Sequence, residues 1–455
     1  MPSTLLTGAL VCTMDETMTV HSPGWISFEG GRISGLGSGA PPIPTMTGCS
    51  EVIDCPGLAI LPGFVNAHTH LCQSLMRGEV EGGPLERWLL EVTRPYGNAI
   101  SAEETHLACC LSLVENLRCG VVGVVQHHKL TMSQAHVDAA ASAATRAGMR
   151  MLLARGWRDR GPRSENPDAA AEEVIRLREK WERSSCGLVA LGVGPTSLEN
   201  CSDEGLRRVV AFAQQLDIPV HMHVSETANE VSSHVERTGR RPVDWLEQLG
   251  ALGPNTHLVH AVWISDAEVE LIARAGAQVV HCPVSNAFLS AGVARVGHLV
   301  RSGISVSLGT DGAASNASQN LLETAKFAAL STKLGNGGRD ALTAAQILRM
   351  MTTNPAALLN RGAPTALRAG APADFTLVRM NTVRTVPSIR PDLAIIYRAC
   401  PSDVHSVFVG GRRLLVDGRI TSLDEEALIR ECRQAADALI MRVYGRRSLE
   451  AREVA

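Results

Sequence analysis

Aromatic residues are scarce in this sequence, at 4% of 455 residues. A surface that stacks nucleic-acid bases needs several exposed aromatic rings, so this scarcity disfavours a nucleic-acid-binding protein. The formal net charge of −3 also excludes a strongly basic protein. We therefore expect neither nucleic acid nor an anionic membrane as the main partner.

Other absences narrow the class of protein further. No run of about 18 apolar residues occurs, so the sequence predicts no membrane-spanning helix. The N-terminus has no basic segment and carries Asp15 and Glu16 early, which matches a secretory signal poorly. None of the 12 cysteines forms a C-x-x-C pair, which disfavours ribbon-type zinc sites and thioredoxin-like chemistry. These features favour a cytoplasmic protein.

The overall composition is typical of soluble globular proteins. Hydrophobic residues make up 45% and charged residues 20% of the chain, and the mean hydropathy is +0.05. The length suffices for one large domain with a smaller one, or for two to three average domains.

The middle of the chain alternates short apolar runs with amphipathic helical patterns. Two capping boxes mark helix starts, Ser101 with Glu104 and Ser265 with Glu268, and Gly120 ends the first of these helices. Eight parallel strands separated by helices are the number that closes a (β/α)8 TIM barrel. The eight predicted strands end near His68, Gln126, Arg155, Gly194, His223, Ala261, Pro283 and Thr310.

The two ends of the chain have a different pattern, with short strands separated by glycine turns. Residues 25–29 precede Gly30-Gly31, and residues 407–409 precede Gly410-Gly411. Two β-rich pieces at opposite ends of a barrel most simply meet in one small β-sandwich. The predicted parts are residues 1–60 and 372–423 (the sandwich), 61–371 (the barrel) and 424–455 (a C-terminal helix and tail).

The strongest chemical signal is the sequence Asn66-Ala67-His68-Thr69-His70, directly after an apolar run. Residues i and i+2 of an extended strand point to the same side, so His68 and His70 are able to bind one ion together. Taken alone, the pair fits two surface or core histidines equally well. Later strand ends make this second interpretation weak.

Three later strand ends carry side chains of the same kind. His223 ends one strand and is followed by Glu226, His260 ends the next, and Asp311 follows the eighth. The C-terminal ends of barrel strands meet on one face, where barrel enzymes have their active sites. The sequence therefore predicts that these histidines and carboxylates converge.

These residues and their neighbours resemble the amidohydrolase superfamily, within it the group of S-adenosylhomocysteine, 8-oxoguanine and pterin deaminases and s-triazine hydrolases. The resemblance covers nearly the whole chain and rests on residues 62–70, 223–227, 281–286 and 309–316. It implies one divalent ion, usually zinc and otherwise Fe2+, and it implies Glu226 and His260 as acid–base residues. The implied metal ligands are His68, His70, His223 and Asp311.

Two-metal relatives have a carbamylated lysine at the end of strand four, where this sequence has Gly194-Pro195-Thr196, so we expect a mononuclear site. Three neutral imidazoles and a carboxylate leave a coordination position for water, whose pKa the ion lowers. We expect Asp311 to take the proton of this water and Glu226 to protonate a ring nitrogen. His260 is expected to polarise the incoming hydroxide or stabilise the tetrahedral adduct. The combined H-x-E and P-C-x-x-C signature of other zinc deaminases is absent.

Several further residues are candidates for substrate contacts, each with a structural alternative. Gln73 resembles the glutamine of triazine hydrolases, or it caps a helix. Trp88 forms a pocket wall over the substrate, as the family implies, or lies in the core. His127 and His128 resemble residues of the oxopurine and pterin deaminases, or they are buried strand-end histidines. Arg155 anchors substrate or forms a plain salt bridge.

Thr196 bears on the class of substrate. Family members that deaminate adenosine-type nucleosides typically have a histidine in a G-P-H-S segment, which is Gly194-Pro195-Thr196-Ser197 here. This difference favours a free heterocycle. We therefore expect an aminohydrolase acting on a small N-heteroaromatic compound (oxopurine, pterin, pyrimidine or s-triazine), in which metal-bound hydroxide attacks an amino-substituted ring carbon.

Three alternatives stay open at this point. The first is an adenosine-type nucleoside deaminase acting on S-adenosylhomocysteine or methylthioadenosine. The second is a triazine hydrolase that expels chloride or an alkylamine. The third is a non-catalytic assembly protein of the same fold, which the presence of every ligand together with Glu226 disfavours. By analogy with the family, we expect a homodimer or homotetramer.

Overall fold

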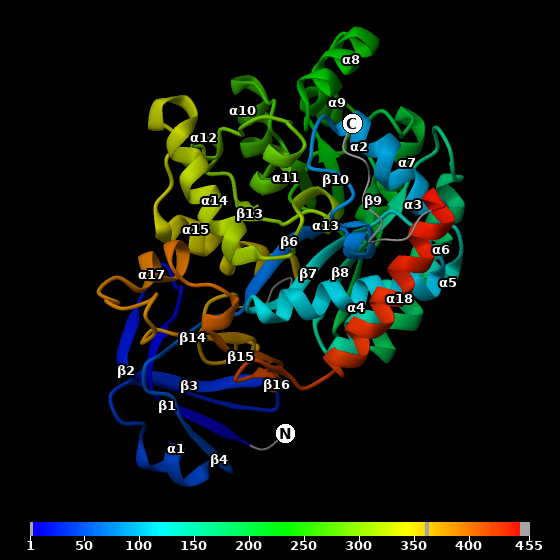
Figure 1. The fold of residues 1–455 in the computed structure, drawn as a ribbon. Coiled ribbons are helices and arrows are strands. Elements are labelled where there is room, and N and C mark those ends of the chain that lie inside the picture. Colours follow the sequence, from blue (N-terminus) through cyan, green and yellow to red (C-terminus); the bar gives the residue numbers. More distant parts are fainter. Residues whose placement is uncertain (1–2, 360–363, 446–455) are drawn as a thin grey trace.

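The structure is a computed structural model that describes residues 3–359 and 364–445. Its larger part is a barrel of eight parallel strands with helices around it (Figure 1). Neighbouring strands follow the order of the sequence. The predicted (β/α)8 barrel is therefore confirmed. Its strands are β6 Phe64–Thr69, β7 Val121–His128, β8 Arg150–Trp157, β9 Val189–Pro195, β10 Val220–Val224, β11 Thr256–His260, β12 Gln278–His281 and β13 Val306–Leu308.

Hydrogen bonds join the first and last barrel strands close to the predicted site. The Asp311 N–H donates to the His68 carbonyl at 3.0 Å, and the Thr310 N–H donates to Asn66 Oδ1 at 3.0 Å. Gly309 permits this approach, because a Cβ atom there would lie 2.8 Å from the Cβ of His68. The closure of the barrel thus places Asp311 beside His68.

Helices connect the strands and cover the outside of the barrel. Both predicted capping boxes are present, with Ser101 accepting from the Glu104 N–H at 3.1 Å and Ser265 from the Glu268 N–H at 3.3 Å. No helix within residues 3–359 and 364–445 is both long and apolar enough to cross a membrane. The barrel helices are α4 Ala102–Arg118, α5 Gln134–Ala147, α6 Pro167–Ser184, α7 Asp203–Gln215, α8 Ala228–Thr238, α9 Pro242–Gln248, α10 Asp266–Ala275, α11 Pro283–Phe288, α12 Val296–Arg301, α13 Ala313–Asn316, α14 Leu321–Leu334, α15 Ala344–Met351 and α16 Thr353–Leu359.

A long connection between β6 and α4 folds into four short helical segments. Several of its residues line the cavity described below, among them Gln73, Trp88 and Arg94. The connection therefore forms part of the wall at the C-terminal ends of the strands. Its segments are η1 Leu71–Met76, α2 Leu85–Trp88, η2 Leu89–Thr93 and α3 Arg94–Ala99.

A second sheet combines both ends of the chain, seen in blue and orange in Figure 1. Its nine strands follow the order β17-β16-β15-β14-β5-β1-β2-β3, with β4 paired to β1. The rings of Phe28, Phe375 and Phe408 pack in its interior, with centroids 4.6–5.7 Å apart. The prediction that the two β-rich ends meet in one small unit is confirmed. The strands are β1 Thr4–Cys12, β2 Val20–Glu29, β3 Arg32–Ser38, β4 Glu51–Asp54, β5 Leu58–Pro62, β14 Phe375–Arg379, β15 Val404–Val409, β16 Arg412–Val416 and β17 Arg419–Ile420.

The predicted C-terminal helix is α18 Glu425–Tyr444, which lies along α4 on the outside of the barrel (Figure 1). Arg118 of α4 pairs with Glu425 at 2.6 Å, and Arg442 of α18 pairs with Glu104. The C-terminal segment is thereby tied to the first barrel helix. The predicted domain boundaries stay predictions, and residues 446–455 of the predicted tail lie outside the described residues.

Candidate metal centre and cavity

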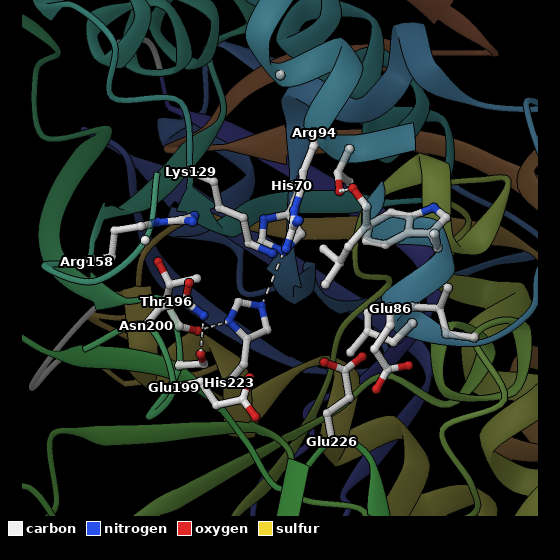
Figure 2. A pocket seen from close by; sticks show the side chains of 18 of the residues that line it. His70, Glu86, Arg94, Lys129, Arg158, Thr196, Glu199, Asn200, His223 and Glu226 are labelled. Atoms are coloured by element: carbon white, nitrogen blue, oxygen red, sulfur yellow. Dashed lines mark hydrogen bonds between the residues drawn. The ribbon is translucent and has the colours of Figure 1, made fainter. Parts of the chain in front are cut away.

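The C-terminal ends of the barrel strands open into a cavity of about 450 Å3 (Figure 2). Its lining includes His70, His223, Glu226, His260 and Asp311, all of which come from strand ends. Small-molecule sites in proteins typically occupy about 300–1,000 Å3. The cavity is therefore large enough for a substituted heterocycle.

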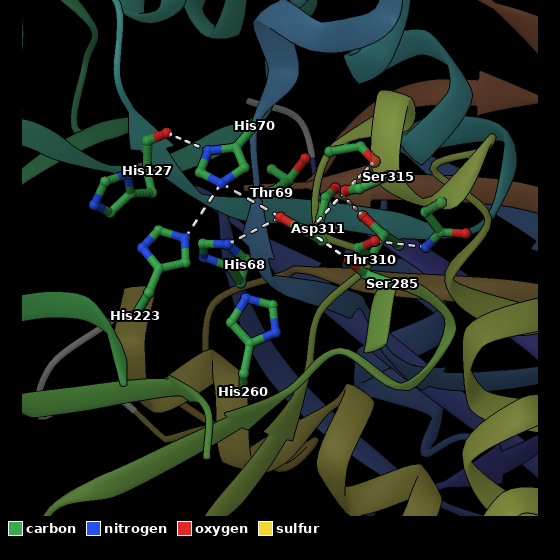
Figure 3. Close-up of polar contacts among 12 residues, drawn as sticks. His68, Thr69, His70, His127, His223, His260, Ser285, Thr310, Asp311 and Ser315 are labelled. Carbon is green, nitrogen blue, oxygen red and sulfur yellow. Dashed lines mark hydrogen bonds and ion pairs between the residues drawn. The ribbon is translucent and has the colours of Figure 1, made fainter. Parts of the chain in front are cut away.

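The four predicted metal ligands converge at the floor of this cavity (Figure 3). The Nε2 atoms of His68 and His70 each lie 3.3 Å from Asp311 Oδ1, and His223 Nε2 lies 3.3 Å from His70 Nε2. Two overlapping groups have ligand atoms within 4.8 Å of one another. They are His68, His70 and His223, and His68, His260 and Asp311.

Backbone carbonyls fix the orientation of two of these rings. His70 Nδ1 lies 2.7 Å from the carbonyl oxygen of His127, and His223 Nδ1 lies 2.9 Å from that of Thr196. A carbonyl oxygen only accepts, so Nδ1 carries the proton in both rings and Nε2 has a free lone pair. Both lone pairs therefore face the centre of the cluster, as metal-binding imidazoles require.

Two serine hydroxyls orient the carboxylate of Asp311. Ser285 and Ser315 donate to its Oδ2 at 2.6 and 2.7 Å, which leaves Oδ1 directed at the histidines. Asp311 itself has a φ of +60°, a left-handed conformation that non-glycine residues adopt rarely. The backbone and both hydroxyls thus hold one carboxylate oxygen in the cluster.

Burial determines the protonation of the cluster. It lowers the pKa of His68 to about 4 and the pKa values of His70 and His223 well below the usual value for histidine. Burial alone would raise the pKa of Asp311, but its contact with His68 and the charge of His70 hold it well below the usual range. At neutral pH the site therefore has neutral imidazoles and an ionised carboxylate.

The donor set fits a divalent cation. Within the described part of the chain, His68 Nε2 and Asp311 Oδ1 are buried atoms without a hydrogen-bond partner. Buried polar atoms nearly always have one, so two such atoms facing each other need explaining. Three neutral imidazole nitrogens and one carboxylate oxygen are ligands that Zn2+ prefers, and Fe2+ accepts similar donors.

The predicted acid–base residues lie beside the ligand cluster. His260 Nε2 is 3.6 Å from Glu226 Oε2, and His260 Nδ1 is 2.8 Å from Asn286 Oδ1. The carboxylate of Glu230 accepts the N–H groups of Ser225 and Glu226 at 3.0 and 2.8 Å, which fixes the turn after β10. Burial raises the pKa of Glu226, and burial with the nearby Glu226 charge raises the pKa of Glu230 to about 7.

Three of the predicted substrate contacts line the cavity: Gln73, Trp88 and Thr196. The Trp88 indole N–H donates to the Ala314 carbonyl at 2.9 Å, which holds the ring in the wall. The Thr196 hydroxyl donates to the Trp157 carbonyl at 3.0 Å. These three side chains are therefore placed where a substrate contact is possible.

Three other predicted contacts lie outside the cavity lining. Arg155 pairs with the carboxylate of Glu165, as its salt-bridge alternative requires. His127 and His128 are fully buried, and the His127 ring lies 4.7 Å from the His223 ring between centroids. Their part in substrate binding stays a prediction, because the contacts in the structure are with other protein groups.

Sequence reasoning gave no role to several residues of the site. Ser285, Asn286 and Ser315 lie inside the segments 281–286 and 309–316, so they were within the quoted motifs. Lys129 and Arg158 line the cavity and follow the ends of β7 and β8 directly. Their position just past a strand end, on the face where barrel sites lie, was the available signal.

The chain is similar to known proteins both in sequence and in structure. A sequence model described as "Amidohydrolase family" matches residues 59–414. The chain is 33% identical to a 5'-deoxyadenosine deaminase of Methanosarcina mazei, over 97% of this chain and 100% of that protein. It is 32% identical to a 5-methylthioadenosine/S-adenosylhomocysteine deaminase of Nitratidesulfovibrio vulgaris, over 95% and 96% of the two chains. The crystal structure of an adenosine deaminase from Xanthomonas campestris with bound zinc is similar with a TM-score of 0.89 at 28% identity, over 96% of this chain and 98% of that one.

Proposed function

Because this chain belongs to the amidohydrolase family, we propose that it is a metal-dependent deaminase. It hydrolyses the C–N bond of an amino-substituted N-heteroaromatic ring and releases ammonia. The observation that carries the proposal is the convergence of three histidines and Asp311 beside Glu226 at the floor of one cavity. The three similar proteins named above are each called a deaminase, which supports the same reaction type.

The Nε2 atoms of His68, His70 and His223 and the Oδ1 atom of Asp311 would hold one divalent ion. We favour zinc over Fe2+ because a structurally similar deaminase contains zinc. Such an ion, when bound, lowers the pKa of a water molecule and supplies a nucleophile at neutral pH. The three imidazoles are neutral at that pH, so they need not lose protons when the ion binds.

The protein side chains move the protons of the reaction. Asp311 is ionised and accepts a proton from the attacking water. Glu226 holds a proton to higher pH than an exposed glutamate and donates it to the ring nitrogen beside the reacting carbon. The proton that Asp311 took from the water then passes to the amino group, which leaves as ammonia when the C–N bond breaks. The remaining hydroxyl proton of the tetrahedral adduct returns to Glu226 as the ring carbonyl forms. His260, with its Nδ1–H fixed on Asn286, uses the Nε2 lone pair to orient the water.

Adenosine-type nucleosides are a second candidate class of substrate, which the names of the similar proteins favour. Thr196 favours a free heterocycle instead. Its hydroxyl proton is already donated to the Trp157 carbonyl, so it has only lone pairs to offer a ligand. A histidine at this position, as nucleoside deaminases of the family have, would supply a partner that Thr196 does not.

A panel of substrates tests the proposal. Zinc-loaded protein is assayed for ammonia release from guanine, 8-oxoguanine, isoxanthopterin and aminotriazines, and from adenosine, 5'-deoxyadenosine, methylthioadenosine and S-adenosylhomocysteine. We expect at least one compound to reach a kcat/KM of about 10⁴ M⁻¹ s⁻¹, the lower end of the enzyme range. Absence of ammonia release from every compound contradicts the proposal.

Glu226→Gln gives the test of mechanism. The variant keeps the size of the side chain but removes its proton transfer, so kcat should fall by about 10²–10⁴ while the metal stays bound. The matched control is Glu247→Gln, which makes the same change at an exposed ion pair with Arg274. A near-normal kcat for Glu226→Gln would make this residue structural.

The ranking within the panel tests the Thr196 argument separately. We expect the best free heterocycle to exceed the best nucleoside by at least about tenfold in kcat/KM, or ~1.4 kcal/mol. The opposite ranking would assign the nucleoside class and leave the roles of the metal ligands and Glu226 as proposed.

A further inference from the structure

Three histidines form a hydrogen-bonded chain that leads from the metal ligands into the interior of the barrel. His68 Nδ1 lies 2.8 Å from His221 Nε2, and His221 Nδ1 lies 3.3 Å from His257 Nδ1. We call His68, His221 and His257 the histidine chain. Its three members are buried, with 0%, 0% and 2% of their surface exposed. Burying polar rings is costly unless they are hydrogen-bonded, so this arrangement calls for a functional explanation.

The register of two neighbouring strands places the chain behind the metal ligands. β10 and β11 pair in parallel with His221 opposite His257. Side chains alternate along a strand, so His221 points to the same side of the sheet as His223, two residues further on. Neither His221 nor His257 is among the residues that line the cavity. Both therefore lie deeper in the barrel than the site itself.

The partner of His68 differs in kind from the partners of the other two metal-binding rings. His70 and His223 each donate the Nδ1 proton to a backbone carbonyl (Figure 3 shows this contact for His70). A carbonyl oxygen only accepts, whereas an imidazole nitrogen donates in one tautomer and accepts in the other. Contact with His221 alone therefore does not determine which nitrogen of His68 carries the proton.

A second tautomer of His68 would block the ligand atom. The ionised carboxylate of Asp311 has its Oδ1 only 3.3 Å from His68 Nε2, so a proton on Nε2 would have an acceptor there. A ring with that proton has no lone pair to offer a metal ion. If Nδ1 had no acceptor, its proton would be buried without a partner, and the blocked tautomer would be favoured.

The histidine chain provides the acceptor that the metal-binding tautomer needs. With the proton of His68 on Nδ1, His221 accepts it at Nε2 and carries its own proton on Nδ1. That proton is donated to His257 Nδ1, so each contact in the chain joins one donor to one acceptor. Burial keeps the pKa of His221 well below the usual value, so this ring has only one proton at neutral pH.

We propose that His221, oriented by His257, is a positioning residue that holds His68 in the tautomer whose Nε2 lone pair faces the metal ion. This inference rests on the proposed function, because it takes His68 as a metal ligand. His221 and His257 act only through His68, so their removal should change the metal affinity.

The test measures the zinc Kd of metal-free protein by competition with a chromogenic chelator. His221→Leu fills similar space without an acceptor and should bind zinc about 10–100-fold more weakly, as loss of a supporting hydrogen bond typically does. In His221→Gln the amide oxygen accepts from His68 and the amide N–H donates to His257, so its Kd should lie within about threefold of the wild type. Rescue by glutamine separates a hydrogen-bonding role from a space-filling one.

A second variant tests the order of the chain. His257→Leu leaves the Nδ1–H of His221 without its acceptor and should weaken zinc binding by about fivefold. The double variant should bind zinc within about twofold of His221→Leu alone, because His257 acts through His221. His234→Leu is the control, since His234 is a histidine of α8 that is 1% exposed and lies outside the chain. Its zinc Kd should stay within about twofold of the wild type.

Circular dichroism checks that each variant is folded. If His221→Leu fails to fold, His221→Asn replaces it, because the asparagine side chain is one carbon shorter than glutamine and should not rescue zinc binding. A folded His221→Leu with wild-type zinc affinity would overturn the inference, and so would a His221→Gln that binds zinc as weakly as the leucine variant.

The outcome is separable from that of the proposed function. The expected order of zinc affinities without ammonia release from any compound of the panel contradicts the deaminase assignment and supports the histidine chain. Zinc-dependent ammonia release by the wild type, together with unchanged zinc affinity in His221→Leu, contradicts the role of the histidine chain alone.

Discussion

Replacing Ser285 and Ser315 by alanine should weaken metal binding although neither residue is a ligand. Both hydroxyls donate to Asp311 Oδ2, at 2.6 and 2.7 Å, and thereby direct Oδ1 at the histidines. Without them the carboxylate is free to rotate, and ordering it again on metal binding reduces the affinity. Removal of such supporting hydrogen bonds typically weakens metal binding by about 10–100-fold.

The size of the effect follows from the shared acceptor. A hydrogen bond to a charged group contributes about 1.5–3 kcal/mol, but each hydroxyl partly compensates for loss of the other because both bind the same oxygen. We therefore expect about fivefold weaker zinc binding in each single variant and about 100-fold in the double variant, or ~1 and ~2.8 kcal/mol.

The assay is competition for zinc between the metal-free protein and a chromogenic chelator of known affinity. Ser232→Ala is the matched control, because Ser232 is an exposed serine on α8 whose hydroxyl donates to the carbonyls of Ala228 and Asn229 on its own helix. Circular dichroism checks that every variant is folded. A folded double variant with wild-type zinc affinity would refute the idea that these hydroxyls position the carboxylate.

Three further predictions concern neighbouring residues. His260→Ala should keep its metal and lose about 10²–10⁴ in kcat, and loss of metal, measured by elemental analysis, would instead make His260 a ligand. His70→Ala should lose both metal and turnover, and retention of the metal would remove His70 from the ligand set. Burial raises the folded-state pKa of Glu230 from 4.5 to about 7, so its contribution to the free energy of unfolding is present below pH 4.5 and lost as pH rises through about 7. For Glu230→Gln, the free energy of unfolding in urea should differ less between about pH 5 and pH 8 than it does for the wild type. The same pH difference in both proteins would contradict the raised pKa of Glu230.

The barrel could be predicted from the sequence because its signals are local. The capping boxes at Ser101 and Ser265 need only four consecutive residues each, and each barrel strand is a short apolar run of its own. The pairing of β5 with β14 joins segments on either side of the whole barrel sequence. Glycine turns in the sequence predicted both strand-rich ends. The register between the strands of the two ends depends on packing around Phe28 and Phe375, and a local sequence pattern carries no information about that packing.

The same distinction holds in the site. His68, His223 and Asp311 each end a strand, so the geometry of a parallel barrel turns their local positions into one cluster. Ser285 acts only through Asp311, a partner from the following strand end. Arg155 and Arg158 both lie at the end of β8, so the sequence gives the same local signal for each. In the structure Arg155 pairs with Glu165, whereas Arg158 lines the cavity. Only the folded structure shows this difference.

The most direct test of the central claim measures metal content and ammonia release on one preparation. The protein is analysed as purified, after exhaustive chelation, and after addition of one equivalent of zinc per chain, with the best substrate of the panel. We predict about one divalent ion per chain, loss of turnover on chelation and recovery with one equivalent of zinc. Full turnover after chelation, or two tightly bound ions per chain, would contradict the account.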